Sequence, residues 1–405
     1  MNILILHPAF PGQFLYLCGY LAQNPENKVV FLAKENTIGT NIAGVSLALY
    51  EKPKSSEGGH SYLKPADEAV REGQQTIRAL DSLRHKGFVP DVIIGHTGWG
   101  SLLYVKDLYP EIPVLGYFEW YYHGLHSDAH WWPDEKPDLN SLLSVRTKNA
   151  HHLLSLEACD AGYTPTQWQY EQFPTEYQYK LSVLHDGIDT RFCVPAEKHS
   201  PGLVLEDIKL SLPPDTEIIT YVSRGFEVYR GFPYFMDAMR IILQHRPKCQ
   251  VIVVGNDRVC YGYKLKDTTY QQAEEKKGGY DTTRLHFVGP RNRGDYRKIL
   301  QASSVHVYLT RPFILSWSML EAMSFGCPLV ASKTPPVEEV VQDGVNGLLA
   351  EFRSPHHIAR RVEELLDDRA LAERLGRAAR ETVLERYELT KCLRRQENLM
   401  YSLMK

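Results

Sequence analysis

The sequence predicts an α/β protein with two doubly wound parallel sheets, each covered by helices on both faces. Its strand-like segments are short and apolar throughout, which is typical of parallel strands buried on both faces. They alternate with longer amphipathic segments that have the periodicity of helices. The strand-like segments form two series on either side of a polar, proline-rich stretch at residues 189–214, so we expect two such domains.

The elements follow in chain order. The first series of predicted strands is residues 3–6, 29–32, 91–94, 114–117, 153–155 and 182–184. The second series is residues 217–222, 250–254, 285–288, 305–309 and 328–331. Helix formers at three- and four-residue spacing predict helices from residue 356 onward, with an interruption at Gly376. Residues 50–64 and 256–283 lack a clear period and are expected to be surface loops or lids.

Length and charge exclude few function classes. The 405 residues suffice for two or three domains. The 46 Lys and Arg residues nearly balance the 49 Asp and Glu residues, which gives no electrostatic argument for a nucleic-acid partner.

The cysteines and the first residues indicate a cytoplasmic protein. The seven cysteines are scattered and include no Cys-x-x-Cys pair, which argues against a disulfide framework and against a zinc site. The opening segment, MNILILHPAFPGQF, has no basic start and reads as a buried strand rather than a signal peptide. No apolar run approaches the ~20 residues that span a membrane. Peripheral contact with the inner face of the membrane stays open.

Two glycine turns are candidate ligand sites. Gly12, in HPAFPGQF, permits a tight turn before a helix whose N–H groups would face an anion; the alternative is an ordinary strand-to-helix turn. Gly187, in HDGID, lies at the end of the first series, and a plain turn at the domain boundary is at least as good an explanation.

Two arginines follow the first strand of the second series, in YVSRGFEVYRGFPYF. Arg224 and Arg230 flank a turn before a helix that begins near Phe232. Guanidinium groups match phosphate oxygens, and a helix N-terminus favours negative charge, so the pair suits a diphosphate. The alternative is two solvated arginines.

One acid lies inside an apolar helix, in RPFILSWSMLEAMSFGCPLVAS. Glu321 is flanked by Leu320 and Ala322 on a helix expected over residues 317–325. Because an unpaired buried carboxylate is costly, it must accept hydrogen bonds, and a pair of ligand hydroxyls would supply them. The alternative is a salt bridge to an arginine across the core.

Further polar residues stand where ligands bind in open α/β sheets, at the carboxyl ends of strands. HTGWG (96–100) follows one predicted strand, and GYFEWYYHG (116–124) places Glu119 and His123 after the next. The aromatic density there suits carbohydrate stacking or core packing equally. His151 and His152 are adjacent, have no metal-ligand spacing, and are expected to be structural.

Missing motifs narrow the chemistry. The sequence has no Asp-x-Asp, no Walker loop and no Gly-x-Gly-x-x-Gly after its first strand. This disfavours metal-dependent phosphoryl transfer and hydride transfer with a dinucleotide, and no metal site or cofactor is expected.

Taken in order, these segments resemble the retaining glycosyltransferases of family 4, which have the GT-B fold. The matching segments are FPGQF, HDGID, SRGFEVYRGF, VVGND, LHFVGP, SMLEAMSFGCPLVAS and EEVVQDGVNGLLAEF. The resemblance implies two Rossmann-like domains facing a central cleft: an acceptor domain at residues 1–190 and a donor domain at 191–385. Residues 386–405 would form a helix that packs back on the first domain. It also implies metal-independent transfer from a UDP- or GDP-sugar to a saccharide or lipid-linked acceptor, in polysaccharide or glycoconjugate biosynthesis.

The resemblance also implies roles for residues. Arg224 and Arg230 would hold the diphosphate and stabilise its developing charge, and Glu321 would bind the ribose hydroxyls. Glu119 and His123 would orient the acceptor or the donor sugar. The remaining predicted donor-binding residues are Gly12, Gly187, Gly255, Asn256, Val288, Gly289, Ile314, Leu315 and Ser316.

The chain departs from the family pattern at two positions. Many members have a second Glu eight residues before the ribose-binding one, where this chain has Phe313; the second arginine, Arg230, is usually Lys. The turn at residues 313–316 would then contact the sugar through its backbone N–H groups. A sugar-nucleotide epimerase, a phosphorylase and a non-catalytic partner subunit of the same fold are the alternatives.

Overall fold

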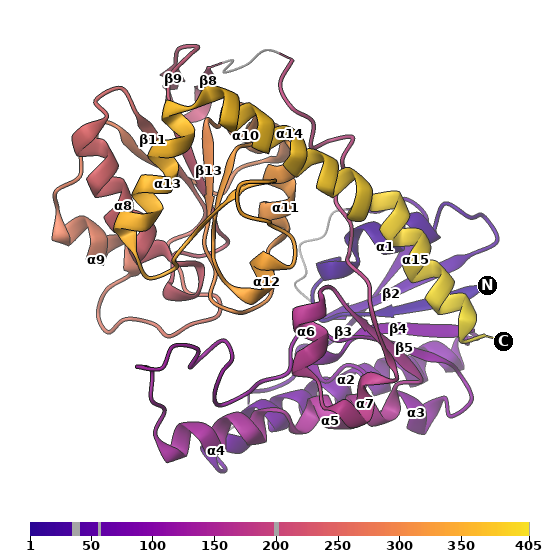
Figure 1. Cartoon of the computed structure of the whole chain (residues 1–405). Helices are drawn as coiled ribbons and strands as arrows, with labels where there is room; N and C mark the ends of the chain where they lie inside the picture. The colour runs from indigo at the N-terminus through magenta and orange to yellow at the C-terminus, as the bar shows by residue number, and fades with distance from the viewer. Residues whose placement is uncertain (35–40, 56–57, 198–201, 405) are drawn as a thin grey trace. The chain divides into compact units, whose positions relative to one another are not determined.

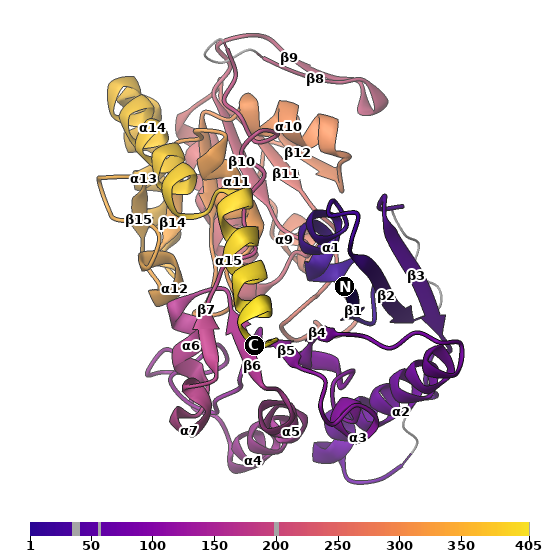
Figure 2. The ribbon, with the colours of Figure 1, turned by 90° about the vertical axis from the view of Figure 1, so that its right-hand side faces the viewer.

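The computed structural model describes residues 1–34, 41–55, 58–197 and 202–404. The chain divides into two compact units: unit 1 comprises Met1–Gly187 and Thr390–Lys405, and unit 2 comprises Ile188–Leu389. The polypeptide therefore leaves unit 1 once and returns to it with its last helix, coloured yellow in Figures 1 and 2.

Unit 1 contains a seven-stranded parallel sheet in the order β3-β2-β1-β4-β5-β6-β7. Its central strand is buried on both faces, as Ile3, Leu4 and Ile5 are 0% exposed. The strands are β1 (Asn2–Leu6), β2 (Lys28–Lys34), β3 (Val45–Tyr50), β4 (Val92–His96), β5 (Val114–Tyr117), β6 (Ala161–Thr164) and β7 (Leu181–Val183).

Helices cover both faces of this sheet, with α1 and α15 on one face and α2, α3 and α5 on the other (Figures 1 and 2). The last helix is attached by side-chain hydrogen bonds: Tyr20 donates to Glu397 (3.0 Å), and Gln396 donates to the His185 carbonyl (3.0 Å). The helices are α1 (Leu15–Leu21), α2 (Lys64–His85), α3 (Val105–Leu108), α4 (Leu139–Lys148), α5 (Ala150–Ala158), α6 (Gln167–Gln172), α7 (Thr175–Gln178) and α15 (Leu389–Ser402), with 3-10 turns η1 (Gly12–Phe14), η2 (Ser61–Leu63) and η3 (Thr97–Trp99).

Unit 2 contains a six-stranded parallel sheet in the order β12-β11-β10-β13-β14-β15 and a separate antiparallel hairpin, β8-β9. Both large sheets are doubly wound around their first strand, which confirms the predicted fold class. The strands are β8 (Leu203–Leu205), β9 (Leu210–Leu212), β10 (Ile218–Val222), β11 (Gln250–Val254), β12 (Leu285–Gly289), β13 (Val305–Tyr308), β14 (Leu329–Ser332) and β15 (Leu348–Ala350).

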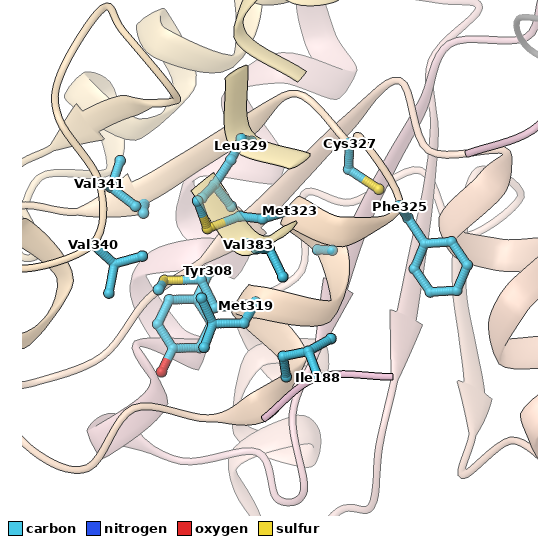
Figure 3. Close-up of a cluster of buried hydrophobic side chains, with 14 of the residues drawn as sticks. Ile188, Tyr308, Met319, Met323, Phe325, Cys327, Leu329, Val340, Val341 and Val383 are labelled. Carbon is cyan, nitrogen blue, oxygen red and sulfur yellow. The ribbon is translucent and has the colours of Figure 1, made fainter. Parts of the chain in front are cut away.

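One face of this sheet carries a large apolar core between α11 and α14. Met319 and Met323 of α11 pack near Leu329 and Val383, all at 0% exposure (Figure 3). The helices of unit 2 are α8 (Phe232–His245), α9 (Tyr270–Lys277), α10 (Arg293–Gln301), α11 (Trp317–Ser324), α12 (Pro335–Glu338), α13 (Pro355–Asp367) and α14 (Arg369–Arg386), with 3-10 turns η4 (Glu206–Ile208) and η5 (Val228–Arg230).

One predicted strand is wrong. Residues 153–155 lie inside helix α5, and the next strand is β6, which the sequence analysis missed. A three-residue apolar run does not distinguish a strand from one face of a helix. The missed strand reads AGYT, whose Gly and Thr hide it from a search for apolar runs.

Other differences concern segments expected to be irregular. The proline-rich stretch at 189–214 contains the β8-β9 hairpin, and the loop expected at 256–283 contains α9. Helix α9 begins with a capping box in which Thr269 and Gln272 cap each other, a signal that its polar sequence masked. Edge strands β3 and β15 were also missed, and Gly376 does not interrupt a helix but lies within α14.

Candidate functional site

The carboxyl ends of three adjacent strands in unit 2 form a tight backbone platform. The Ser223 N–H donates to the Val254 carbonyl (3.0 Å), and the Gly255 N–H donates to the Gly289 carbonyl (3.2 Å). Gly255 has φ 145°, and a Cβ there would lie 1.9 Å from the Ser223 carbonyl oxygen, so only glycine fits. The neighbouring Asn256 accepts the Phe226 N–H through its carbonyl (3.1 Å). Four predicted residues, Gly255, Asn256, Val288 and Gly289, thus lie at one edge of the sheet.

A pocket of about 300 Å³ opens beside the end of β10. It brings together Arg224, Ser316 and Glu321, three of the residues that the sequence analysis selected. This is the point where the strand order of the sheet reverses, between β10 and β13, and ligands of open α/β sheets bind at such points. The lining residues are Val222, Ser223, Arg224, Arg291, Arg293, Tyr296, Ser316, Trp317, Ser318 and Glu321.

Glu321 has a tyrosine rather than an arginine as its protein partner. The Tyr296 hydroxyl donates to its Oε2 (2.6 Å), and no ion pair of Glu321 occurs among the described residues. Burial raises the pKa of Glu321, and the hydrogen bond from Tyr296 and the nearby charge of Arg293 lower it only in part. Its Oε1 accepts no hydrogen bond from the described part of the chain, so this oxygen is available to a ligand at the pocket wall.

Arg230 does not line this pocket. It is 5% exposed, and its Nη1 donates to Tyr308 (3.1 Å), Thr310 (2.8 Å) and the Ile314 carbonyl (2.9 Å). The Tyr308 hydroxyl in turn accepts the Ser316 N–H (2.9 Å). Arg230 therefore fixes the turn that holds Ile314, the buried Leu315 and Ser316, whose Oγ caps α11 through the Ser318 N–H (3.3 Å).

Phe313 is packed away from solvent. It is 4% exposed and meets Tyr229 and Tyr261 edge-on, with ring centroids 5.4 and 5.2 Å apart. The same region holds a buried acid, Glu227, whose carboxylate accepts the N–H groups of residues 260–262 and so anchors their loop.

In unit 1, Glu119 belongs to a buried polar cluster. The Gly98 N–H donates to His96 Nδ1 (3.0 Å), so neutral His96 carries its proton on Nε2, which lies 3.4 Å from Glu119. Gln13 donates to the same carboxylate (3.1 Å). Burial would raise the pKa of Glu119, but His96 and Gln13 lower it overall.

His7 completes this cluster. Its ring centroid lies 5.3 Å from that of His96, and burial is the main cause that lowers the pKa of His7 to about 3. Gly12, at φ 53°, makes room for it, because a Cβ at Gly12 would lie 2.5 Å from the His7 ring. The turn at Gly12, predicted as an anion site, therefore also leaves space for the side chain of His7.

Two predicted residues of unit 1 lie apart from this cluster in their contacts. His123 Nε2 bonds the Gln172 carbonyl (2.7 Å) and no residue of the cluster. Gly187, at φ 91°, donates its N–H to His185 Nδ1 (2.9 Å), just before the chain enters unit 2.

His7, His96 and Gln13 were missed as site residues. His7 directly follows β1 and His96 ends β4, and this position at the carboxyl end of a strand is the signal that would have selected them. Within the residues that the structure describes, no group of three or more His, Cys, Asp or Glu side chains is arranged to hold a metal ion. No helix in that part of the chain is long and apolar enough to cross a membrane.

Two families of known proteins match the chain. Residues 25–193 match the family described as "Glycosyl transferase family 4 group", and residues 206–382 match "Glycosyl transferases group 1". A D-inositol 3-phosphate glycosyltransferase of Corynebacterium glutamicum is 24% identical over 49% of this chain and 46% of its own. An alpha-maltose-1-phosphate synthase of Mycobacterium tuberculosis is 28% identical over 51% of this chain and 53% of its own. The matches thus span about half the length of these relatives.

Solved structures match the fold over the whole chain. Sucrose-phosphate synthase of Thermosynechococcus elongatus has a TM-score of 0.72 at 17% identity and covers 100% of this chain and 99% of its own. Anabaena HepE, solved with UDP and glucose, has a TM-score of 0.68 at 15% identity and covers 99% of this chain and 100% of its own. The two family matches, over residues 25–193 and 206–382, show that the chain belongs to the family 4 glycosyltransferases, and the likeness to the solved structures shows that it has the GT-B fold.

Proposed function

We propose that this protein transfers a sugar from a nucleoside diphosphate sugar to a hydroxyl group of a saccharide or lipid-linked acceptor, with retention and without a metal. The observation that carries the proposal is the unit 2 pocket, where Arg224 and the carboxylate of Glu321 face one space at the switch point of the sheet. A uridine nucleotide is the favoured donor because HepE, of the same fold, was solved with UDP and glucose.

The pocket suits the two ends of a nucleoside diphosphate. Glu321 offers an oxygen to ribose hydroxyls, while Arg224 supplies positive charge for phosphate oxygens; Arg291 and Arg293 line the same pocket but are paired with Asp207 (2.8 Å) and Asp189 (3.2 Å). As the glycosidic bond breaks, negative charge grows on the β-phosphate, and a guanidinium beside the pocket stabilises this charge. This arrangement assigns the role of a divalent cation to an arginine.

Arg230 has a different role in this scheme from Arg224. Its guanidinium holds the 313–316 turn through the Ile314 carbonyl and through Tyr308, which accepts the Ser316 N–H, so it positions the N–H group of Leu315 for the sugar or phosphate. Glu119, held by His96 and Gln13, is the proposed contact of unit 1 with a sugar hydroxyl. The seven unpaired cysteines support a reducing compartment such as the cytosol as the place of action.

Thermal stability in the presence of UDP, GDP and ADP tests the proposal. Saturation at ~100 times Kd adds ~2.7 kcal/mol, so one of the three should raise Tm by about 5 °C or more. Glu321→Gln should remove most of this shift, because a neutral amide binds ribose hydroxyls less well, whereas Glu275→Gln, at an exposed site on α9, should keep it.

Release of the nucleotide from its sugar conjugate then distinguishes an enzyme from a binding subunit. An active transferase should liberate the nucleoside diphosphate slowly with water and faster with an acceptor. No Tm shift with any of the three nucleotides contradicts the proposal, and binding without release on any acceptor favours the non-catalytic subunit.

A further inference from the structure

Unit 1 contains a second pocket, of about 360 Å³, that the donor site does not use. It lies where the strand order of this sheet reverses, since Pro8 follows β1 and Gly98 and Trp99 follow β4. The same rule that places the nucleotide in unit 2 therefore selects this pocket as a ligand site in unit 1.

Its wall contains a lysine without a counterion. Lys148, the last residue of α4, places Nζ 3.4 Å from the centre of the Tyr122 ring, and it forms no ion pair among the described residues. Of the three other cations of the wall, Lys34 is compensated by Glu72 (3.8 Å) and Arg71 by Asp67 (2.8 Å), whereas Lys54 is exposed to solvent. Burial lowers the pKa of Lys148, and the nearby charge of Asp128, which forms no ion pair with it, offsets this only in part.

A buried histidine of the wall also lacks a partner. The His152 side chain is 5% exposed and makes no hydrogen bond among the described residues, with Nδ1 fully enclosed. Burial holds the pKa of His152 well below its usual value, so the ring is neutral and carries one N–H donor and one acceptor. Its Nε2 is not enclosed and makes no hydrogen bond among the described residues, so a ligand hydroxyl or phosphate oxygen can bond this nitrogen.

An exposed aromatic ring forms another part of the wall. Trp99 is 49% exposed and stacks on His96 with centroids 5.9 Å apart. An indole face presents apolar area to the C–H face of a sugar or polyol ring. His96 also lies 3.4 Å from Glu119, so this histidine connects Trp99 in the pocket wall to the polar cluster of unit 1.

We propose that this pocket binds the acceptor and that the acceptor is an anionic saccharide, a sugar or polyol ring that bears a phosphate or carboxylate. Lys148 pairs with the anion, His152 bonds a hydroxyl or an oxygen of the anion, and Trp99 covers a ring face. The assignment of the bound saccharide as the acceptor rests on the proposed function. The binding of an anionic saccharide depends only on residues of unit 1.

Calorimetric titration of the full chain with glucose 6-phosphate, glucuronic acid and glucose tests the binding. The two anionic probes should bind at least about tenfold more tightly than glucose, because a hydrogen bond between charged groups is stronger than one between neutral groups. Lys148→Met should remove that preference, and Lys148→Arg should restore part of it. Lys86→Met, at an exposed site after α2, is the matched control and should leave it unchanged.

Trp99→Ala should weaken the binding of all three sugars by a similar factor. This distinguishes the contribution of ring stacking from that of the charge on Lys148. Vesicles of phosphatidylcholine with or without phosphatidylinositol distinguish a lipid headgroup from a free sugar phosphate as the source of the anion. Equal affinity for charged and neutral probes, or an undiminished preference in Lys148→Met, overturns the inference. If such a result comes with a normal Tm shift on adding UDP or GDP, only the acceptor inference is wrong. If the anionic probes bind as expected but no nucleotide shifts Tm, only the proposed donor site is wrong.

Discussion

Arg230 binds three acceptors through a single nitrogen atom, and this predicts which replacement the protein tolerates. A lysine ammonium has three donors on one atom and can serve the same three acceptors, Tyr308, Thr310 and Ile314. Arg230→Met leaves those buried acceptors unpaired and is expected to lower the free energy of unfolding by about 3 kcal/mol.

Arg230→Lys should lose less than half of that amount. Urea unfolding of the two variants beside the parent protein measures the difference. Equal losses in both variants would show that the planar guanidinium itself, and not the donors, stabilises the turn.

The site is only partly predictable at the scale of residues. Arg224 and Glu321 were selected from their positions beside a strand and inside an apolar helix, and they do share a pocket. Tyr296, the partner of Glu321, could not be selected, since its contact depends on how α10 packs against α11. Lys148 gave no signal either, because a lysine at the end of a helix is normally solvated.

Among the elements, α14 depends on a glycine for close packing. A Cβ at Gly376 would lie 2.3 Å from the carbonyl oxygen of Gly326, the residue just beyond α11. Alanine favours an isolated helix by about 1 kcal/mol over glycine, but here it would push two backbones apart in the core of Figure 3.

Gly376→Ala is therefore expected to destabilise unit 2 by several kcal/mol, about 2–4, in thermal unfolding. Gly19→Ala in α1 is the control, since its Cβ would find only a methyl group of Ile42 at 3.4 Å. That variant should be neutral or slightly stabilising. A neutral Gly376→Ala would mean that α14 shifts freely over α11.

Clear sequence patterns predicted the helices and strands that are long or fully buried. Short or partly exposed elements were missed because burial imposes little pattern on their sequences. The central strands are continuous apolar runs and were found within one or two residues. Strand β3 lies at a sheet edge with Leu47 and Leu49 about half exposed, so burial imposes little pattern on it. Strand β6 is short, and its pairing with β5 and β7 holds it in place despite a Gly and a Thr.

For the whole molecule, buried neutral histidines predict sensitivity to acid. The pKa is lowered to about 3 for His7 and to about 4 for His185 in unit 1, and to about 3 for His306 in unit 2, chiefly by burial. An unfolded histidine binds a proton below about pH 6.5. Between that pH and the folded pKa the unfolded state binds more protons, so stability falls as the pH falls.

From about pH 7.5 to about pH 5.5 each such histidine should lower the free energy of unfolding by ~1.4 kcal/mol. Calorimetry should therefore show a larger loss of stability for the unfolding transition of unit 1 than for that of unit 2. The transition of unit 2 is identified as the one whose Tm rises when the nucleotide is added. His306→Gln should flatten the pH dependence of unit 2 only. A flat profile for both units over this range would contradict neutral burial.

The return of the chain to unit 1 has a consequence during synthesis on the ribosome. Unit 2 is one continuous segment, whereas unit 1 needs Cys392, Leu393, Gln396 and Met400, which α15 buries against it. Domains generally fold as they emerge. Unit 2 is therefore complete before unit 1, although its synthesis begins later. The surface of unit 1 that α15 covers stays exposed until residues 390–405 have been made.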